Sequence, residues 1–124
     1  MSHILVVEDS EDLRYIIKSI LKKAGHQVSE ACDGSEVSQC LAGDPIDLVI
    51  TDILMPEQEG IQTIVQIRRS NPEIKIIGMS GGGKGGAEHY LEMAREFGAH
   101  ATMLKPFKKA QLLELVDSLL GASV

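Results

Sequence analysis

Short apolar runs alternate with helical repeats five times along this 124-residue chain. A run that is apolar on both faces fits a strand buried in a parallel sheet, and apolar residues spaced three and four apart fit a helix packed against it. The alternation therefore favours an α/β fold. The five runs predict strands over residues 4–7, 27–31, 48–51, 74–79 and 101–104.

A helix is predicted after each of these strands. Ser10 is a candidate N-cap of the first helix, because a serine hydroxyl at this position can accept from a free backbone amide. Gly25 follows the last apolar residue of that repeat and fits its C-terminal end. The run over residues 81–86 contains five glycines and predicts a loop. The remaining predicted helices cover residues 34–41, 60–70, 87–97 and 108–120.

Charge and length exclude several classes of protein. The formal net charge is −6 and no run of Lys or Arg is longer than two residues, whereas nucleic-acid binding needs a basic stripe. The first apolar segment has four residues and is followed by Glu8, so it is neither a signal peptide nor a membrane span. We expect one cytoplasmic domain over residues 1–124 that contacts neither nucleic acid nor membrane directly.

Polar side chains stand at the ends of four predicted strands. Glu8 and Asp9 follow the first strand, Asp52 the third, Ser80 the fourth and Lys105 the fifth. Because the carboxyl ends of parallel strands meet at one edge of a sheet, we expect these side chains to lie together. One carboxylate after a strand can equally be a helix cap, and Asp9 alone fits that role as well. The presence of polar side chains at four strand ends favours a shared site.

These residue types predict phosphoryl chemistry. Three carboxylates at one edge repel one another unless some are protonated or a cation neutralises them. Mg²⁺ fits best, because it is a hard ion that takes carboxylates and shares its remaining positions with water and phosphate oxygens. A lysine and a hydroxyl at the same point would stabilise a phosphoryl group while a carboxylate oxygen attacks it. The predicted intermediate is an aspartyl phosphate.

Four segments carry a resemblance to a known family. They are Val7-Glu8-Asp9, the stretch from Thr51 to Pro56, Met79-Ser80, and Lys105-Pro106-Phe107, in that order along the chain. Over essentially its whole length, the chain resembles the receiver domain of bacterial two-component response regulators. The resemblance implies a flavodoxin-like fold, in which a five-stranded parallel sheet of order 2-1-3-4-5 has five helices on its two faces.

The resemblance also implies a role for each acidic residue. Asp52 would be the phosphoacceptor. Asp9, Asp52 and the backbone carbonyl of Leu54 would bind Mg²⁺. Glu8 would act mainly through a water bound to the metal.

Two further residues and the partners follow from the same resemblance. The Ser80 hydroxyl would follow the phosphoryl group, and Lys105 would match the family's lysine, with a cis peptide bond to the next proline. The donor would be a sensor histidine kinase or a histidine phosphotransferase, and the output would be binding to a downstream protein target. The chain would not be a conventional enzyme, although it would catalyse its own phosphorylation and dephosphorylation. It would be a monomer or a weak dimer that depends on phosphorylation.

Two alternatives stay open. A degenerate receiver would bind partners without phosphoryl chemistry, although every chemical position is filled here. Residues 78–84 also match the GxxxxGK pattern of a nucleotide-binding loop. Gly85 follows that pattern where such a loop needs a Ser or Thr for its metal, so this alternative is disfavoured.

Overall fold

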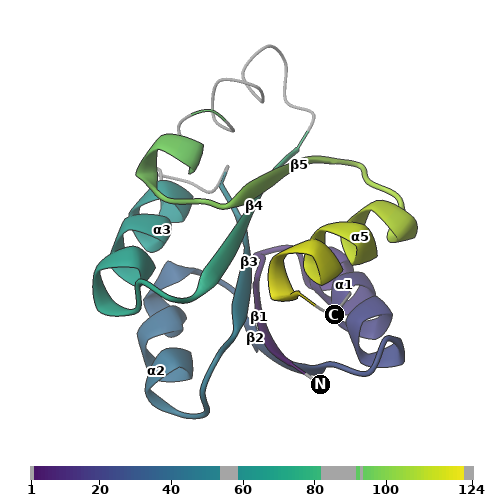
Figure 1. Cartoon of the computed structure of the whole chain (residues 1–124), viewed down its shortest axis with the longest axis horizontal. Coiled ribbons are helices and arrows are strands. Elements are labelled where there is room, and N and C mark those ends of the chain that lie inside the picture. Colours follow the sequence, from purple (N-terminus) through teal and green to yellow (C-terminus); the bar gives the residue numbers. More distant parts are fainter. Residues whose placement is uncertain (1, 54–58, 82–91, 93, 122–124) are drawn as a thin grey trace.

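All five predicted strands are present in one parallel sheet. The computed structural model of the chain describes residues 2–53, 59–81, 92 and 94–121. The strand order is β2-β1-β3-β4-β5, which confirms the predicted fold class (Figure 1). The strands end within two residues of the predicted positions. They are β1 His3–Val7, β2 Gln27–Ala31, β3 Leu48–Asp52, β4 Lys75–Gly81 and β5 Ala101–Lys105.

The helices differ from prediction mainly at the second and fourth positions. The second predicted helix begins as a 3-10 turn because the side chain of Asp33 accepts from the Ser35 amide and closes a tight turn. Residues 92 and 94–97 are helical, and the rest of the fourth predicted helix lies outside the described residues. No helix in the described ranges is long and apolar enough to cross a membrane. The helices are α1 Glu11–Lys23, η1 Gly34–Glu36, α2 Val37–Ala42, α3 Glu59–Ser70 and α5 Lys109–Leu120.

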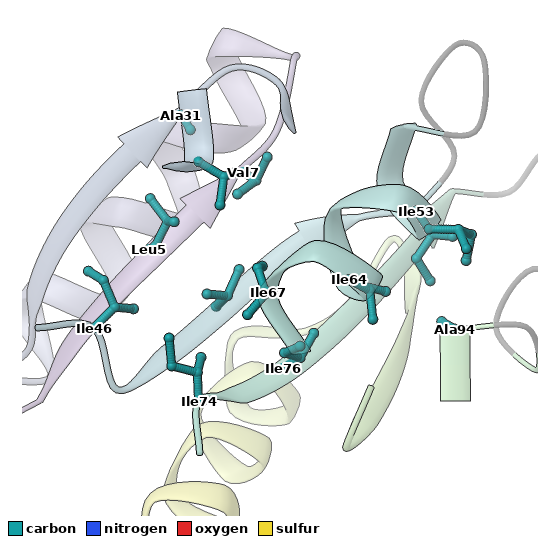
Figure 2. Packing of buried hydrophobic residues seen from close by; sticks show 13 residues of the cluster. Leu5, Val7, Ala31, Ile46, Ile53, Ile64, Ile67, Ile74, Ile76 and Ala94 are labelled. Carbon is teal, nitrogen blue, oxygen red and sulfur yellow. The ribbon is translucent and has the colours of Figure 1, made fainter. Parts of the chain in front are cut away.

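Both faces of the sheet are covered, and β1 shows how its residues divide between them. Helices α1 and α5 cover one face, and α2 and α3 cover the other (Figure 1). Because successive strand side chains point to opposite faces, Ile4 and Val6 pack in the cluster under α1 and α5. Leu5 and Val7 pack in the cluster under α2 and α3, which Figure 2 shows. Because the side chains of β1 pack in turn on both faces, the carboxyl end of β1 lies between two apolar layers.

Helix α1 begins and ends where the sequence predicts. The Ser10 side chain accepts from the Leu13 amide at 3.4 Å, and Gly25 adopts a positive φ of 96° just beyond the helix. The N-cap fixes the short connection between β1 and α1. This connection carries the predicted site residues Glu8 and Asp9.

The glycine-rich stretch is only partly a loop. Gly81 is the last residue of β4 and lies opposite Lys105 in the β4–β5 pairing, so its predicted place in the loop is wrong. Residues 82–86 lie outside the described part of the chain. Residues 78–81, which open the GxxxxGK pattern, are therefore strand, where a phosphate-binding loop would need turns. This geometry argues against the nucleotide-binding alternative.

Close packing explains the glycine at position 78. Gly78 is buried in the middle of β4 and lies opposite Thr51 of β3. A Cβ atom at this position would lie 2.7 Å from Cδ1 of Ile53, the residue that follows Asp52. The absence of a side chain thus lets β4 pack closely against the segment that leaves β3.

We predict that Gly78→Ala lowers the free energy of unfolding by about 1 to 3 kcal/mol, because the new methyl group overpacks this contact. Ile53→Val removes the Cδ1 atom that would clash, so it should recover part of the loss when the two changes are combined. Urea denaturation of the parent, both single variants and the double variant measures this coupling. Strictly additive losses would contradict the packing explanation.

Candidate functional site

The structure brings the predicted strand-end residues together at one edge of the sheet. Glu8 and Asp9 directly follow β1, and Asp52 ends β3. Carboxylate oxygens of these three residues all lie within 4.8 Å of one another. Ser80 is the second-last residue of β4, and Lys105 ends β5. The convergence predicted from the sequence is therefore present in the fold.

Lys105 connects the two buried carboxylates. Its Nζ donates to Asp52 Oδ2 at 2.9 Å and to Glu8 Oε1 at 3.1 Å. Only 1% of the Glu8 side chain and 5% of the Asp52 side chain are exposed, against 18% for Lys105. Burial acts to lower the pKa of Lys105, but its hydrogen bonds and charge interactions with Asp52 and Glu8 outweigh burial and raise it. Lys105 is therefore a charged ammonium at neutral pH.

Glu8 is the carboxylate whose ionisation the fold disfavours most clearly. Its pKa is raised from 4.5 to about 7, mainly because the carboxyl group is buried, and the neighbouring Asp9 and Asp52 contribute to the rise. The Ser10 amide, which donates to Glu8 Oε2 at 3.0 Å, and Lys105 partly oppose it. A share of Glu8 thus carries a proton near neutral pH, which reduces the negative charge of the cluster.

The hydroxyl group of Ser80 is buried at the carboxyl end of β4, at the same edge of the sheet. The residue has no exposed surface, and its Oγ has no hydrogen-bond partner among the described residues. Its strand neighbour Met79 lies opposite Asp52, and Leu104, opposite Ser80 itself, precedes Lys105. A buried hydroxyl without a partner is costly, so such a group calls for a functional explanation.

The resemblance also implies a cis peptide bond before Pro106 and a metal-binding carbonyl at Leu54, and the structure describes the first of these. The peptide bond between Lys105 and Pro106 is cis, as the resemblance implies. Leu54, whose carbonyl was expected to bind Mg²⁺, lies outside the described residues.

Arg14 also contacts the site, and the sequence pattern does not predict this contact. Its Nη1 donates to the backbone carbonyl of Glu8 at 2.8 Å, and its Nε contacts Glu30 Oε1 at 3.2 Å. The sequence feature that could indicate this contact is a basic residue in the first half of the helix that follows Glu8 and Asp9. Nothing in the helical pattern distinguishes such an arginine from one that faces solvent.

Comparisons with known proteins agree with this geometry. A family model described as the response regulator receiver domain matches residues 4–117. The chemotaxis protein CheY of Thermotoga maritima is 33% identical over 115 residues, which are 92% of this chain and 93% of that protein. The crystal structure of the receiver domain of NtrX from Brucella abortus has a TM-score of 0.87 and 28% identity, and the match covers 95% of this chain and 98% of that one.

Other relatives are much longer. The DNA-binding transcriptional regulator NtrC of Azospirillum brasilense is 31% identical over 123 residues, which are 97% of this chain and 24% of NtrC. The chain spans 24% to 46% of the length of two transcriptional regulators that it matches. The similarity to these regulators is thus confined to one part of each.

The raised pKa of Glu8 predicts a pH-dependent contribution to stability. An acid with a higher pKa in the folded state stabilises the fold fully below its unfolded value, here 4.5, and this contribution is lost as the pH rises through about 7. Glu8→Gln cannot titrate, so the variant should gain stability relative to the parent between pH 5 and pH 8. Urea denaturation in buffer with a chelator measures the difference.

Glu11→Gln is the matched control, because it removes one exposed carboxylate close to Glu8 in sequence. A stability difference between Glu8→Gln and the parent that stays constant with pH, or follows that of Glu11→Gln, would contradict the buried position of Glu8.

Proposed function

Because the chain belongs to the response regulator receiver domain family, we propose that it is a phosphoacceptor that receives a phosphoryl group on Asp52. The donor is the phosphohistidine of a sensor histidine kinase or of a histidine phosphotransferase. The observation that carries the proposal is the pair of hydrogen bonds that Lys105 makes to Asp52 and Glu8. They put a fixed ammonium beside the carboxylate that would react.

In the proposed transfer, a carboxylate oxygen of Asp52 attacks phosphorus in line with the bond to the donor histidine. The new O–P bond forms as the P–N bond breaks, and the histidine nitrogen keeps the electron pair. Charge on the phosphoryl oxygens is stabilised by donors that are already in position. Lys105 is one, because its ammonium lies 2.9 Å from Asp52 Oδ2.

The acidic cluster fits a divalent cation. Its three carboxylates are hard oxygen donors within 4.8 Å of one another, and Asp9 is the exposed member of the cluster. Asp9 and Asp52 would hold Mg²⁺ directly, the Leu54 carbonyl would complete the protein ligands, and Glu8 would act through a bound water. Mg²⁺ supplies positive charge that offsets both the carboxylates and the incoming phosphoryl oxygens.

Ser80 would couple phosphorylation to a change in the fold. A phosphoryl oxygen on Asp52 offers its buried hydroxyl an acceptor, which supports a small shift of the end of β4 toward β3. Such a shift would change the surface beyond β4 that a downstream protein binds. From the sequence, ordering of the glycine-rich loop over residues 81–86 is the expected response. Gly81 is already the last residue of β4, and residues 82–86 lie outside the described part of the chain.

We predict that a small phosphodonor and Mg²⁺ add one phosphoryl group to the parent protein and none to Asp52→Asn. Intact-protein mass spectrometry before and after incubation measures the gain. Asp44→Asn is the control, because Asp44 is an exposed aspartate in a loop and should leave labelling unchanged. Equal labelling of Asp52→Asn would place the acceptor elsewhere. An unlabelled parent would favour a binding module that needs no phosphorylation.

A second prediction concerns the metal. Mg²⁺ should raise the melting temperature of the parent, since a ligand that binds only the folded state adds stability, about 2.7 kcal/mol at a hundredfold excess over Kd. Asp9→Asn removes one proposed ligand and should show a much smaller rise, measured by thermal denaturation with and without Mg²⁺. Equal rises in both proteins would place the ion away from Asp9.

A further inference from the structure

Arg14 joins the acidic segment after β1 to the edge strand β2. One nitrogen, Nη1, donates to the Glu8 carbonyl at 2.8 Å, and a second, Nε, donates to Glu30 Oε1 at 3.2 Å. Only 16% of the Arg14 side chain is exposed. The planar guanidinium thus bridges a backbone acceptor and a carboxylate through two separate nitrogens.

The backbone contact acts on Asp9 through the peptide bond. The Glu8 carbonyl belongs to the planar unit that ends at the Cα of Asp9. A hydrogen bond to this oxygen therefore restricts the rotation of the whole unit. The Glu8 amide donates to the Ala31 carbonyl at 3.1 Å, so the segment is held on both sides of Glu8. Together the two bonds limit where the Asp9 carboxylate can reach.

Glu30 anchors the arginine. It lies in β2 opposite Val6 of β1, so the parallel pairing fixes its backbone relative to the strand that carries the site. Lys18 of α1 donates to its other oxygen at 2.8 Å. Figure 1 shows α1 beside β1 and β2. The hydrogen bonds from Arg14 and Lys18 to Glu30 connect this helix to the sheet.

We propose that Arg14, anchored by Glu30, is a positioning residue that holds the Glu8–Asp9 segment in the geometry that binds Mg²⁺. The inference rests on the proposed function, because it concerns the same metal site. Partners that orient metal ligands commonly change metal affinity by tenfold or more. Arg14 would be such a partner, acting on Asp9 through the backbone.

A purely electrostatic effect of Arg14 would change the Mg²⁺ affinity in the opposite direction. Arg14 is a cation near an acidic cluster, so its removal should strengthen Mg²⁺ binding if its effect were only electrostatic. Lys18→Met is a matched control, because it also removes one cation from Glu30 but breaks no described contact with Glu8. The two variants thus separate loss of charge from loss of position.

The experiment measures the Kd of Mg²⁺ by isothermal titration calorimetry for the parent, Arg14→Met and Lys18→Met. Circular dichroism first establishes a temperature at which all three are folded. We expect Arg14→Met to bind Mg²⁺ roughly tenfold more weakly than the parent. Lys18→Met should bind it as tightly as the parent or more tightly. If Arg14→Met does not fold, Arg14→Lys replaces it, since lysine keeps the charge but lacks the planar two-nitrogen bridge, and weaker binding is again expected.

Equal or tighter binding by the Arg14 variant, relative to Lys18→Met, would overturn the positioning role. A parent protein that binds no Mg²⁺ in the same titration would instead refute the metal site of the proposed function and the positioning role with it. Since the parent is titrated alongside the variants, the two failures give different results.

Discussion

The ion pairs of Lys105 with Asp52 and Glu8 are the contacts on which the candidate site depends. They join residues that lie 53 and 97 positions apart in the chain. The two carboxylates are almost fully buried, and their negative charges repel each other unless a counter-charge lies beside them. The ammonium group of Lys105 neutralises one of the two negative charges. The remaining negative charge is what the proposed Mg²⁺ would offset.

The parallel sheet is what makes this arrangement possible. Every strand of such a sheet ends at the same edge, so an acid after β1, an acid at the end of β3 and a lysine at the end of β5 come together. In the sheet order, β3 and β4 separate β1 from β5. The side chains of Lys105 and Glu8 reach toward each other across this separation and meet at 3.1 Å. The absence of a side chain at Gly78 keeps the segment after β3 close to β4.

Much of the site could be predicted from the sequence, because a strand end is visible where an apolar run meets a polar residue. Asp52, Ser80 and Lys105 were found in this way. The contact between Lys105 and Glu8 was not, since it depends on how far two side chains reach across the sheet. Arg14 was missed for a similar reason: its acceptor is a backbone carbonyl, and no side-chain pattern reports one. Because glycines continue past the end of β4, the sequence pattern predicts Gly81 in a loop although it is a strand residue.

The proposed function requires that Asp52, Ser80 and Lys105 act on one phosphoryl group. A crystal structure of the protein with Mg²⁺ and a beryllium trifluoride mimic of that group tests it most directly. We predict that the mimic lies on Asp52, with Lys105 Nζ moved from Glu8 to one fluorine and Ser80 Oγ donating to another. A mimic bound elsewhere, or one on Asp52 while Lys105 stays on Glu8 and Ser80 stays without a partner, would contradict it.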